Sequence, residues 1–166
     1  MAASSTQHPP EDATKFEVPS PLKIEHEELH STLVRATRQA DPVGAAAKVV
    51  AMLLHPHFVK EEQFALPPLA LLGPLARGEW KGEMTEVLGL TDKLQAELPQ
   101  MLAEHRAIVA ALDKLEEAAA AQGTPEYAEF AAKLKLHAQT EEEVSYPTAI
   151  LVGEYVKLKL HSPTYA

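Results

Sequence analysis

The sequence predicts an all-α protein folded as an antiparallel up-down four-helix bundle with a flexible N-terminal tail. Aromatic residues make up only 5% of its 166 residues, and alanine, leucine, glutamate and lysine dominate the middle of the chain, which favours helices. Four long amphipathic stretches are joined by mostly short turns, and a bundle is the natural way to bury their apolar faces. A chain of this length fits a single domain.

The N-terminal residues 1–20 are expected to form a disordered tail, because they are rich in Ser, Thr and Pro and show little periodicity. The first helix is predicted over about residues 21–40. Ser20 suits the N-cap of this helix, and Pro21 suits its first position.

The second helix is predicted to open at Asp41 and Pro42, which repeat the cap-and-proline signal. It should run to about residue 66, where two prolines bend or end it. Residues 69–98 contain several glycines and a further proline. We expect a connection with short helical pieces there.

A third helix should run from Pro99 to Gly123, because glycine is favoured just past the end of a helix. Pro125 then opens a fourth helix, which Pro147 bends before a helical tail near residues 148–160. The expected domain plan is a disordered tail, one bundle and a short C-terminal tail, over residues 1–20, 21–160 and 161–166.

Composition excludes several function classes. A net charge of −9 and a pI near 5.3 argue against a nucleic-acid interface. There is no cysteine, so any metal site must use histidine and oxygen ligands, and disulfides and iron–sulfur clusters are excluded. The chain shows neither a signal-peptide core nor an apolar run of about 20 residues, so we expect a cytoplasmic protein without a membrane partner. The oligomeric state is left open.

An internal repeat relates the two halves of the chain. The segment 57–67 matches the segment 137–147 at an offset of 80 residues (137 minus 57), and each has a glutamate four residues after its histidine. The segments around His26 and His105 match at an offset of 79 (105 minus 26). The chain therefore consists of two helical hairpins, each with a histidine on its first helix and a histidine and a glutamate on its second.

These repeated residues point to a buried metal site. Residues four apart share a helical face, so each second histidine and its glutamate lie side by side on an otherwise apolar stripe. Burying bare carboxylates costs several kcal/mol each, and bound cations would offset that cost. Two carboxylates and four imidazoles are too many ligands for one catalytic zinc ion but fit two adjacent, carboxylate-bridged ions. Iron suits this donor set best, with manganese and zinc as alternatives. The predicted ligands are His26, His57, Glu61, His105, His137 and Glu141.

At these residues the chain resembles the hemerythrin-like family, also called the HHE cation-binding domain. The order His26, HFVKE, His105 and HAQTE covers nearly the whole of residues 22–147. The resemblance implies an up-down bundle around a non-haem di-iron centre, which in various members binds dioxygen, senses oxygen, nitric oxide or iron, or handles peroxide. It also implies that His26 and His57 bind one iron and His105 and His137 the other, with both glutamates bridging.

The chain departs from the pattern of the oxygen-carrying hemerythrins at two places. Those proteins have a second histidine four residues after the third-helix ligand, where this chain has Val109, whereas here His30 follows His26 by four residues and is a candidate extra ligand. They also place the last carboxylate five residues after its histidine, where this chain has Glu142. We therefore expect redox chemistry with hydrogen peroxide or nitric oxide, at a more open iron held by His105 and His137, in preference to reversible oxygen carriage.

The remaining histidines and the neighbours of the ligands receive other roles. His55 falls on another helical face, and His8 and His161 lie near the termini, so none of the three is expected to bind metal. Five residues are expected to surround the ligands or to line the pocket, with the two glutamates otherwise solvated: Glu62, Phe64, Val109, Glu142 and Val144.

Tyrosines are a further class of ligand for iron. Tyr146 is nine residues after His137, which is about 180° around an α-helix, so it is not expected to reach the site. Whether Tyr155 or Tyr165 ligates metal is left open.

Two functions from different classes follow. The first is a di-iron protein that binds, senses or reduces dioxygen, hydrogen peroxide or nitric oxide, without an assignment as an enzyme and without a catalytic residue beyond the metal site. The alternative is a metal- or oxygen-responsive regulatory or iron-binding module without catalysis. A scaffold or storage bundle with only loose metal binding is a third reading.

Overall fold

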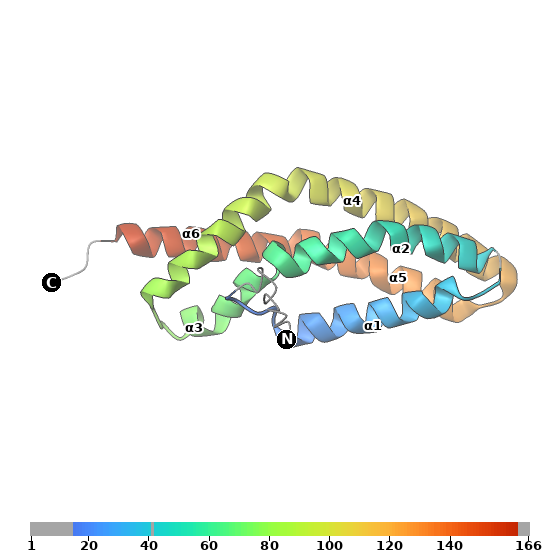
Figure 1. Cartoon of the computed structure of the whole chain (residues 1–166), viewed down its shortest axis with the longest axis horizontal. Helices are drawn as coiled ribbons and strands as arrows, with labels where there is room; N and C mark the ends of the chain where they lie inside the picture. The colour runs from blue at the N-terminus through green and yellow to red at the C-terminus, as the bar shows by residue number, and fades with distance from the viewer. Residues whose placement is uncertain (1–14, 41, 163–166) are drawn as a thin grey trace, which may run out of the picture.

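The structure is a computed structural model that describes residues 15–40 and 42–162. Every element in these ranges is helical, which confirms the all-α prediction (Figure 1). Within the same ranges, no helix combines the length and the apolar composition needed to cross a membrane. Residues 1–14 of the predicted tail, and residues 163–166, lie outside the described part of the chain.

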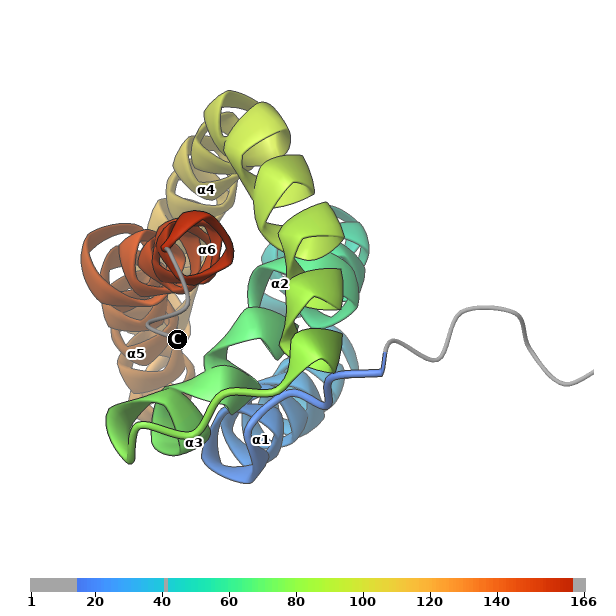
Figure 2. The same ribbon diagram turned by 90° about the vertical axis from the view of Figure 1, so that its left-hand side faces the viewer.

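Four long helices lie side by side around a common interior. They are α1 (Ser20–Thr37), α2 (Val43–Lys60), α4 (Val87–Gln122) and α5 (Pro125–Thr140). Helix α2 packs on both α1 and α4, and α5 packs on α4 and α1, as the end-on view shows (Figure 2). The arrangement is compatible with the predicted four-helix bundle.

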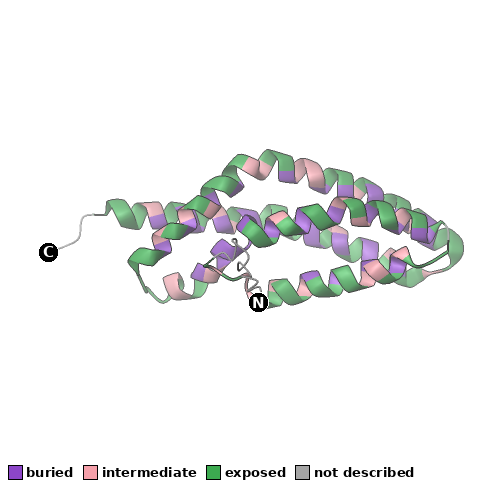
Figure 3. Cartoon of the chain, in the orientation of Figure 1, coloured by how far each residue is buried: buried purple, intermediate pink, exposed green. Residues whose placement is uncertain are grey.

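Burial follows the helical period. In α1 the buried residues recur every three or four positions, at His26, Leu29, Leu33 and Ala36. The same inward-facing stripes are visible on the other long helices (Figure 3). The main apolar core lies between these stripes, and the histidines of the repeat continue it in register.

The connection between α2 and α4 covers one end of the interior. It contains η2 (Pro67–Leu71), α3 (Leu72–Ala76) and η3 (Gly82–Glu86), and η2 and η3 pack against both α4 and α6 (Tyr146–His161). These are the short helical pieces that the sequence predicted. Phe16, from the end of the predicted tail, is partly buried against the same part of the molecule.

One predicted helix start and one predicted helix cap are wrong. Helix α4 begins at Val87 and passes through Pro99, where we expected the third helix to begin. Proline cannot donate the hydrogen bond to the carbonyl four residues back, which here is that of Gln95. Gln95 and Pro99 are both exposed, so water can donate to this carbonyl instead. At the first helix, Ser20 makes no capping bond, because Pro19 occupies the cap position and Ser20 already lies inside α1.

Two π-helical turns interrupt the long helices at corresponding positions of the repeat: η1 (Glu61–Ala65) and η4 (Glu141–Ser145). The backbone N–H of Leu66 donates to the carbonyl of Glu61 at 2.9 Å, and that of Tyr146 donates to Glu141, so each bond spans five residues. A proline follows each of these two amides. In an α-helix the proline ring would clash with the carbonyl four residues back, and a wider turn relieves that clash.

Gly153→Ala is predicted to destabilise the protein, because α6 approaches α4 closely at this residue. An added Cβ would lie 2.3 Å from Oγ1 and 2.7 Å from Cβ of the buried Thr91. One helix must move, and we expect the free energy of unfolding in urea to fall by about 1–3 kcal/mol. Gly89→Ala, in the exposed first turn of α4 where nothing lies within 4 Å, should be neutral or stabilising by up to about 1 kcal/mol. Equal losses in the two variants would contradict this account.

Candidate metal centre

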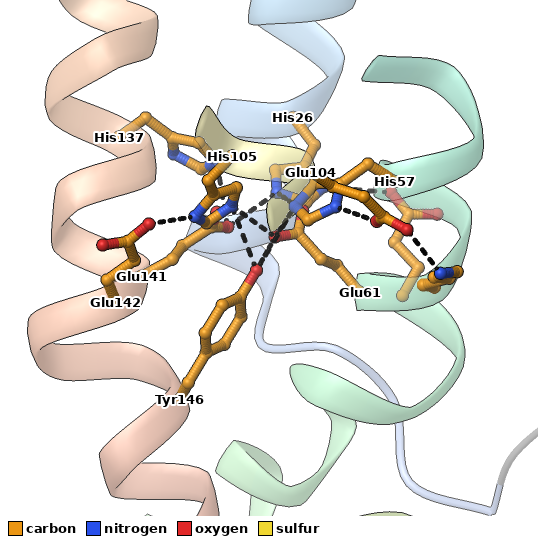
Figure 4. Close-up of polar contacts among 11 residues, drawn as sticks. His26, His57, Glu61, Glu104, His105, His137, Glu141, Glu142 and Tyr146 are labelled. Carbon is orange, nitrogen blue, oxygen red and sulfur yellow. Dashed lines mark hydrogen bonds and ion pairs between the residues drawn. The ribbon is translucent and has the colours of Figure 1, made fainter. Parts of the chain in front are cut away.

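Six buried side chains meet in the interior (Figure 4). Each long helix contributes one histidine and each π-helical turn begins with one glutamate: His26 (α1), His57 (α2), His105 (α4), His137 (α5), Glu61 (η1) and Glu141 (η4). None of the six is more than 7% exposed. They are the six predicted ligands, and the structure brings all of them together.

The six side chains form two groups that share both glutamates. In the His26–His137 group, one nitrogen of each imidazole and one oxygen each of Glu61 and Glu141 lie within 4.8 Å of one another. The His57–His105 group meets the same criterion with the same two glutamates. Glu61 places Oε2 3.5 Å from His26 and Oε1 3.0 Å from His57, so its two oxygens face different groups. Each group could hold a metal ion, and the two groups share both carboxylates.

The structure corrects the histidine pairing that the family resemblance implied. His26 lies with His137 rather than with His57, and His105 lies with His57. Each pair of histidines therefore joins the two hairpins instead of belonging to one of them.

Four inward-facing atoms of the His26–His137 group have no hydrogen-bond partner among the residues that the structure describes: Nε2 of His26, Nε2 of His137, Oε2 of Glu61 and Oε1 of Glu141. Nε2 of His137 lies only 2.9 Å from Oε1 of Glu141, yet the two atoms are not aligned for a hydrogen bond. An unsatisfied buried polar atom costs about 1–3 kcal/mol. One cation between these four atoms would satisfy all of them, so the residues present fit a metal ion.

Each histidine also has a carboxylate at its outward nitrogen, Nδ1. The distances are 3.3 Å for His26–Glu62, 2.7 Å for His57–Glu104, 2.9 Å for His105–Glu142 and 3.4 Å for His137–Glu25. A carboxylate accepts hydrogen bonds, so it favours the proton on Nδ1 and leaves the Nε2 lone pair facing inward. Such support is typical of metal-binding histidines.

Two of the supporting carboxylates, Glu62 and Glu142, lie beside the ligands as predicted, whereas Glu25 and Glu104 were missed. Glu25 directly precedes His26, and Glu104 directly precedes His105, so on its helix each points about 100° away from that histidine. Each therefore reaches a histidine on a neighbouring helix. The repeat held a signal for them, because Glu25 and Glu104 share the offset of 79 residues (104 minus 25) that relates the histidines they precede.

The carboxylates control the protons of the metal-free centre. Burial alone lowers the pKa of His105, but contacts with Glu141 and Glu61 outweigh it and raise that pKa to about 10. Burial raises the pKa of the Glu141 carboxyl, but contacts with three imidazoles, those of His105, His137 and His26, hold it well below its usual range. Metal-binding imidazoles are neutral, so metal binding should release protons from these histidines.

Tyr146 is a seventh residue of the centre, contrary to the prediction. Its hydroxyl donates to Oε1 of Glu61 and lies 3.4 Å from Nε2 of His57 and 3.3 Å from Nε2 of His105 (Figure 4). The prediction assumed a regular α-helix, but η4 adds one residue to the turn, which places Tyr146 about 40° from Glu141 instead of about 140°. Burial and the Glu61 and Glu141 carboxylates raise its pKa, so the hydroxyl remains a proton donor.

An aromatic ring shields each group. Phe58, which the prediction did not name, stacks on His26 with ring centroids 4.0 Å apart and planes 3° apart. On the other side, the ring of Tyr146 stacks on His105 at 5.7 Å. Both aromatic residues are buried, so they keep water away from the imidazole faces.

Other predicted site residues lie elsewhere. His30 is exposed and belongs to neither group, so the structure does not place it among the ligands of the centre. Val144 is 56% exposed and does not line the interior, whereas its repeat counterpart Phe64 is buried.

The remaining candidates lie away from both groups or beyond the described part of the chain. Val109 is half-buried, and Tyr155, His55 and His161 are exposed. His8 and Tyr165 fall outside the described residues.

Tyr146→Phe should destabilise the metal-free protein, because Glu61 loses the hydroxyl that donates to it in the buried centre. We expect a loss of about 1–3 kcal/mol in the free energy of unfolding, measured by urea denaturation after chelation. Tyr155→Phe on the exposed side of α6 is the matched control and should change that free energy by less than about 0.5 kcal/mol. If the two variants are equally stable, the Tyr146 hydroxyl is not a structural part of the centre.

Comparison of the chain with models of known protein families, with curated proteins and with solved structures finds no match in any of the three. The assignment of a function therefore rests on the side chains of the centre and on their geometry.

Proposed function

We propose that the protein is a hemerythrin-like di-metal protein, an antiparallel up-down bundle that binds, senses or reduces a small oxidant. Two iron ions are the preferred occupants, with manganese or zinc as alternatives. His26 and His137 would hold one ion, and His57 and His105 the other. Glu61 and Glu141 would bridge them.

The observation that carries the proposal is the set of four unpartnered buried atoms in the His26–His137 group. A core that merely buried hydrogen-bonded histidines would leave few such atoms, because buried polar groups are nearly always paired. The outward carboxylates add to this, since they leave the inward nitrogen of each histidine free to bind a cation.

The charges around the centre also suit two cations. Two bridging and four outward carboxylates surround it, and within the described residues the one lysine paired with them is Lys60, whose Nζ lies 2.6 Å from Glu104. With neutral imidazoles, these groups nearly balance the charge of two divalent ions. Burial raises the pKa of Glu104, but hydrogen bonds from His57, Lys60 and Gln100 lower it to about 2, so this carboxylate stays charged at neutral pH.

The same residues indicate what the centre can do. Iron bound there would supply a reversible change between the ferrous and ferric states. Each group offers two imidazoles and two carboxylate oxygens, which leaves positions open at an octahedral ion. The Tyr146 hydroxyl lies beside the His57–His105 group and can donate a hydrogen bond or a proton to a small ligand there.

The enclosure of the centre sets the size of the ligand. All six predicted ligands are at most 7% exposed, and Phe58 and Tyr146 cover the imidazole faces. This enclosure favours a small oxidant over a larger substrate.

Metal analysis of untagged protein tests the proposal. We expect two iron or manganese ions per chain after anaerobic loading and desalting. His57→Ala should lose at least one ion, because that change removes a proposed ligand of the His57–His105 group. His161→Ala, at the exposed end of α6, is the control and should retain both ions. Fewer than one ion per chain in the unaltered protein would contradict the di-metal proposal. So would a metal content of His57→Ala equal to that of the unaltered protein.

The same preparation separates the candidate activities. Rapid loss of added hydrogen peroxide or nitric oxide, with oxidation of the loaded protein, supports reduction. A reversible optical change under dioxygen supports binding instead.

A further inference from the structure

Two histidines that the centre does not use, His30 on α1 and His55 on α2, face one groove between these helices. Two adjoining cavities of about 210 and 260 Å³ lie along it, and we call them together the α1–α2 groove. His30, His55 and Phe58 line both cavities. The two imidazoles therefore lie where the cavities meet, on opposite sides of the groove.

The α1–α2 groove leads from the surface to the centre. The larger cavity is also lined by Glu62 and His26, and Oε1 of Glu62 lies 3.3 Å from Nδ1 of His26. Phe58, below the two exposed imidazoles, stacks on the His26 ring. Nε2 of His26, only 2% exposed, is one of the unpartnered atoms of the centre. Nitrogen and oxygen atoms that can bind a metal ion therefore line the way from the solvent to the His26–His137 group.

We propose that His30, His55 and Glu62 form a second, outer metal site, which captures a divalent transition-metal ion before it passes to the centre. Two imidazoles and a carboxylate are a suitable donor set for such an ion. The three side chains are exposed and do not form a closed cluster. They can therefore turn toward one ion and release it again, as a capture site requires.

Charge and sequence position both favour this site. Lys23 also lines the larger cavity, but Glu27 and Glu62 outnumber it, so the opening is negative overall. The repeat places Val109 at the position of His30 (an offset of 79) and Lys135 at that of His55 (an offset of 80). The paired histidines are therefore found on α1 and α2 only, although the ligands of the centre recur in both halves.

The outer site can be tested without the centre. Glu61→Gln with Glu141→Gln removes both bridging carboxylates at nearly constant volume. Titrated with cobalt(II), this variant should still bind one weakly held ion, and adding His30→Ala and His55→Ala should abolish that binding. If the Glu61→Gln/Glu141→Gln variant does not fold, the same titration is made on the unaltered protein. One weakly held cobalt ion should then be bound in addition to those of the centre, and His30→Ala/His55→Ala should abolish its binding. Cobalt binding that is unchanged by loss of both histidines would overturn the outer site.

The capture role rests on the proposed function, and the rate of loading tests it separately. Metal-free protein is mixed with cobalt(II), and filling of the centre is followed by visible absorption. His30→Ala/His55→Ala should slow filling about fivefold or more while the final number of ions in the centre is unchanged, because the local supply of metal is lost. His161→Ala is the control. An unchanged rate of filling would overturn the capture role. If the centre never fills in the unaltered protein, the proposed function is contradicted, and the cobalt titration alone then decides whether the outer site exists.

Discussion

Two carboxylates buried side by side are the constraint on which the rest of the structure depends. Glu61 is 0% exposed and Glu141 is 3% exposed, and leaving either charge unpaired in the interior would cost several kcal/mol. Four imidazoles surround them, one from each long helix, and a carboxylate at each outward nitrogen holds every ring in place. The four helices are thus tied together at the centre by polar contacts, and the apolar core continues from there.

The prolines that follow the two glutamates shape the centre as much as the glutamates do. Each proline is preceded by a π-helical turn, and the added residue changes which side chains face inward. In the second half the residue after this turn is Tyr146, which lies in the centre. At the equivalent place in the first half the chain has Leu66. The identity of the residue at this position, in a turn that both halves share, is therefore one source of the difference between the two groups.

The sequence predicted the all-α class and the six residues of the centre because both depend on patterns along the chain. These six residues recur at offsets of 79 and 80 residues and fall in register with buried apolar residues, so the pattern alone places His26 in the interior. Features set by packing or by local deviations from the α-helix could not be found this way. The place of Tyr146 depends on the π-helical turn, and the histidine pairs depend on how the side chains pack between the helices. The position of Pro99 inside α4 could not be predicted either, because proline is found both at the start of a helix and at a bend, and the sequence signal is the same.

We propose that two ions share Glu61 and Glu141, each between a pair of histidines from different hairpins. Anomalous scattering from crystals of iron- or manganese-loaded protein tests it most directly. The account predicts two peaks about 3.5–4 Å apart, one between His26 and His137 and one between His57 and His105. A single peak, no peak, or ions between His26 and His57 would contradict it.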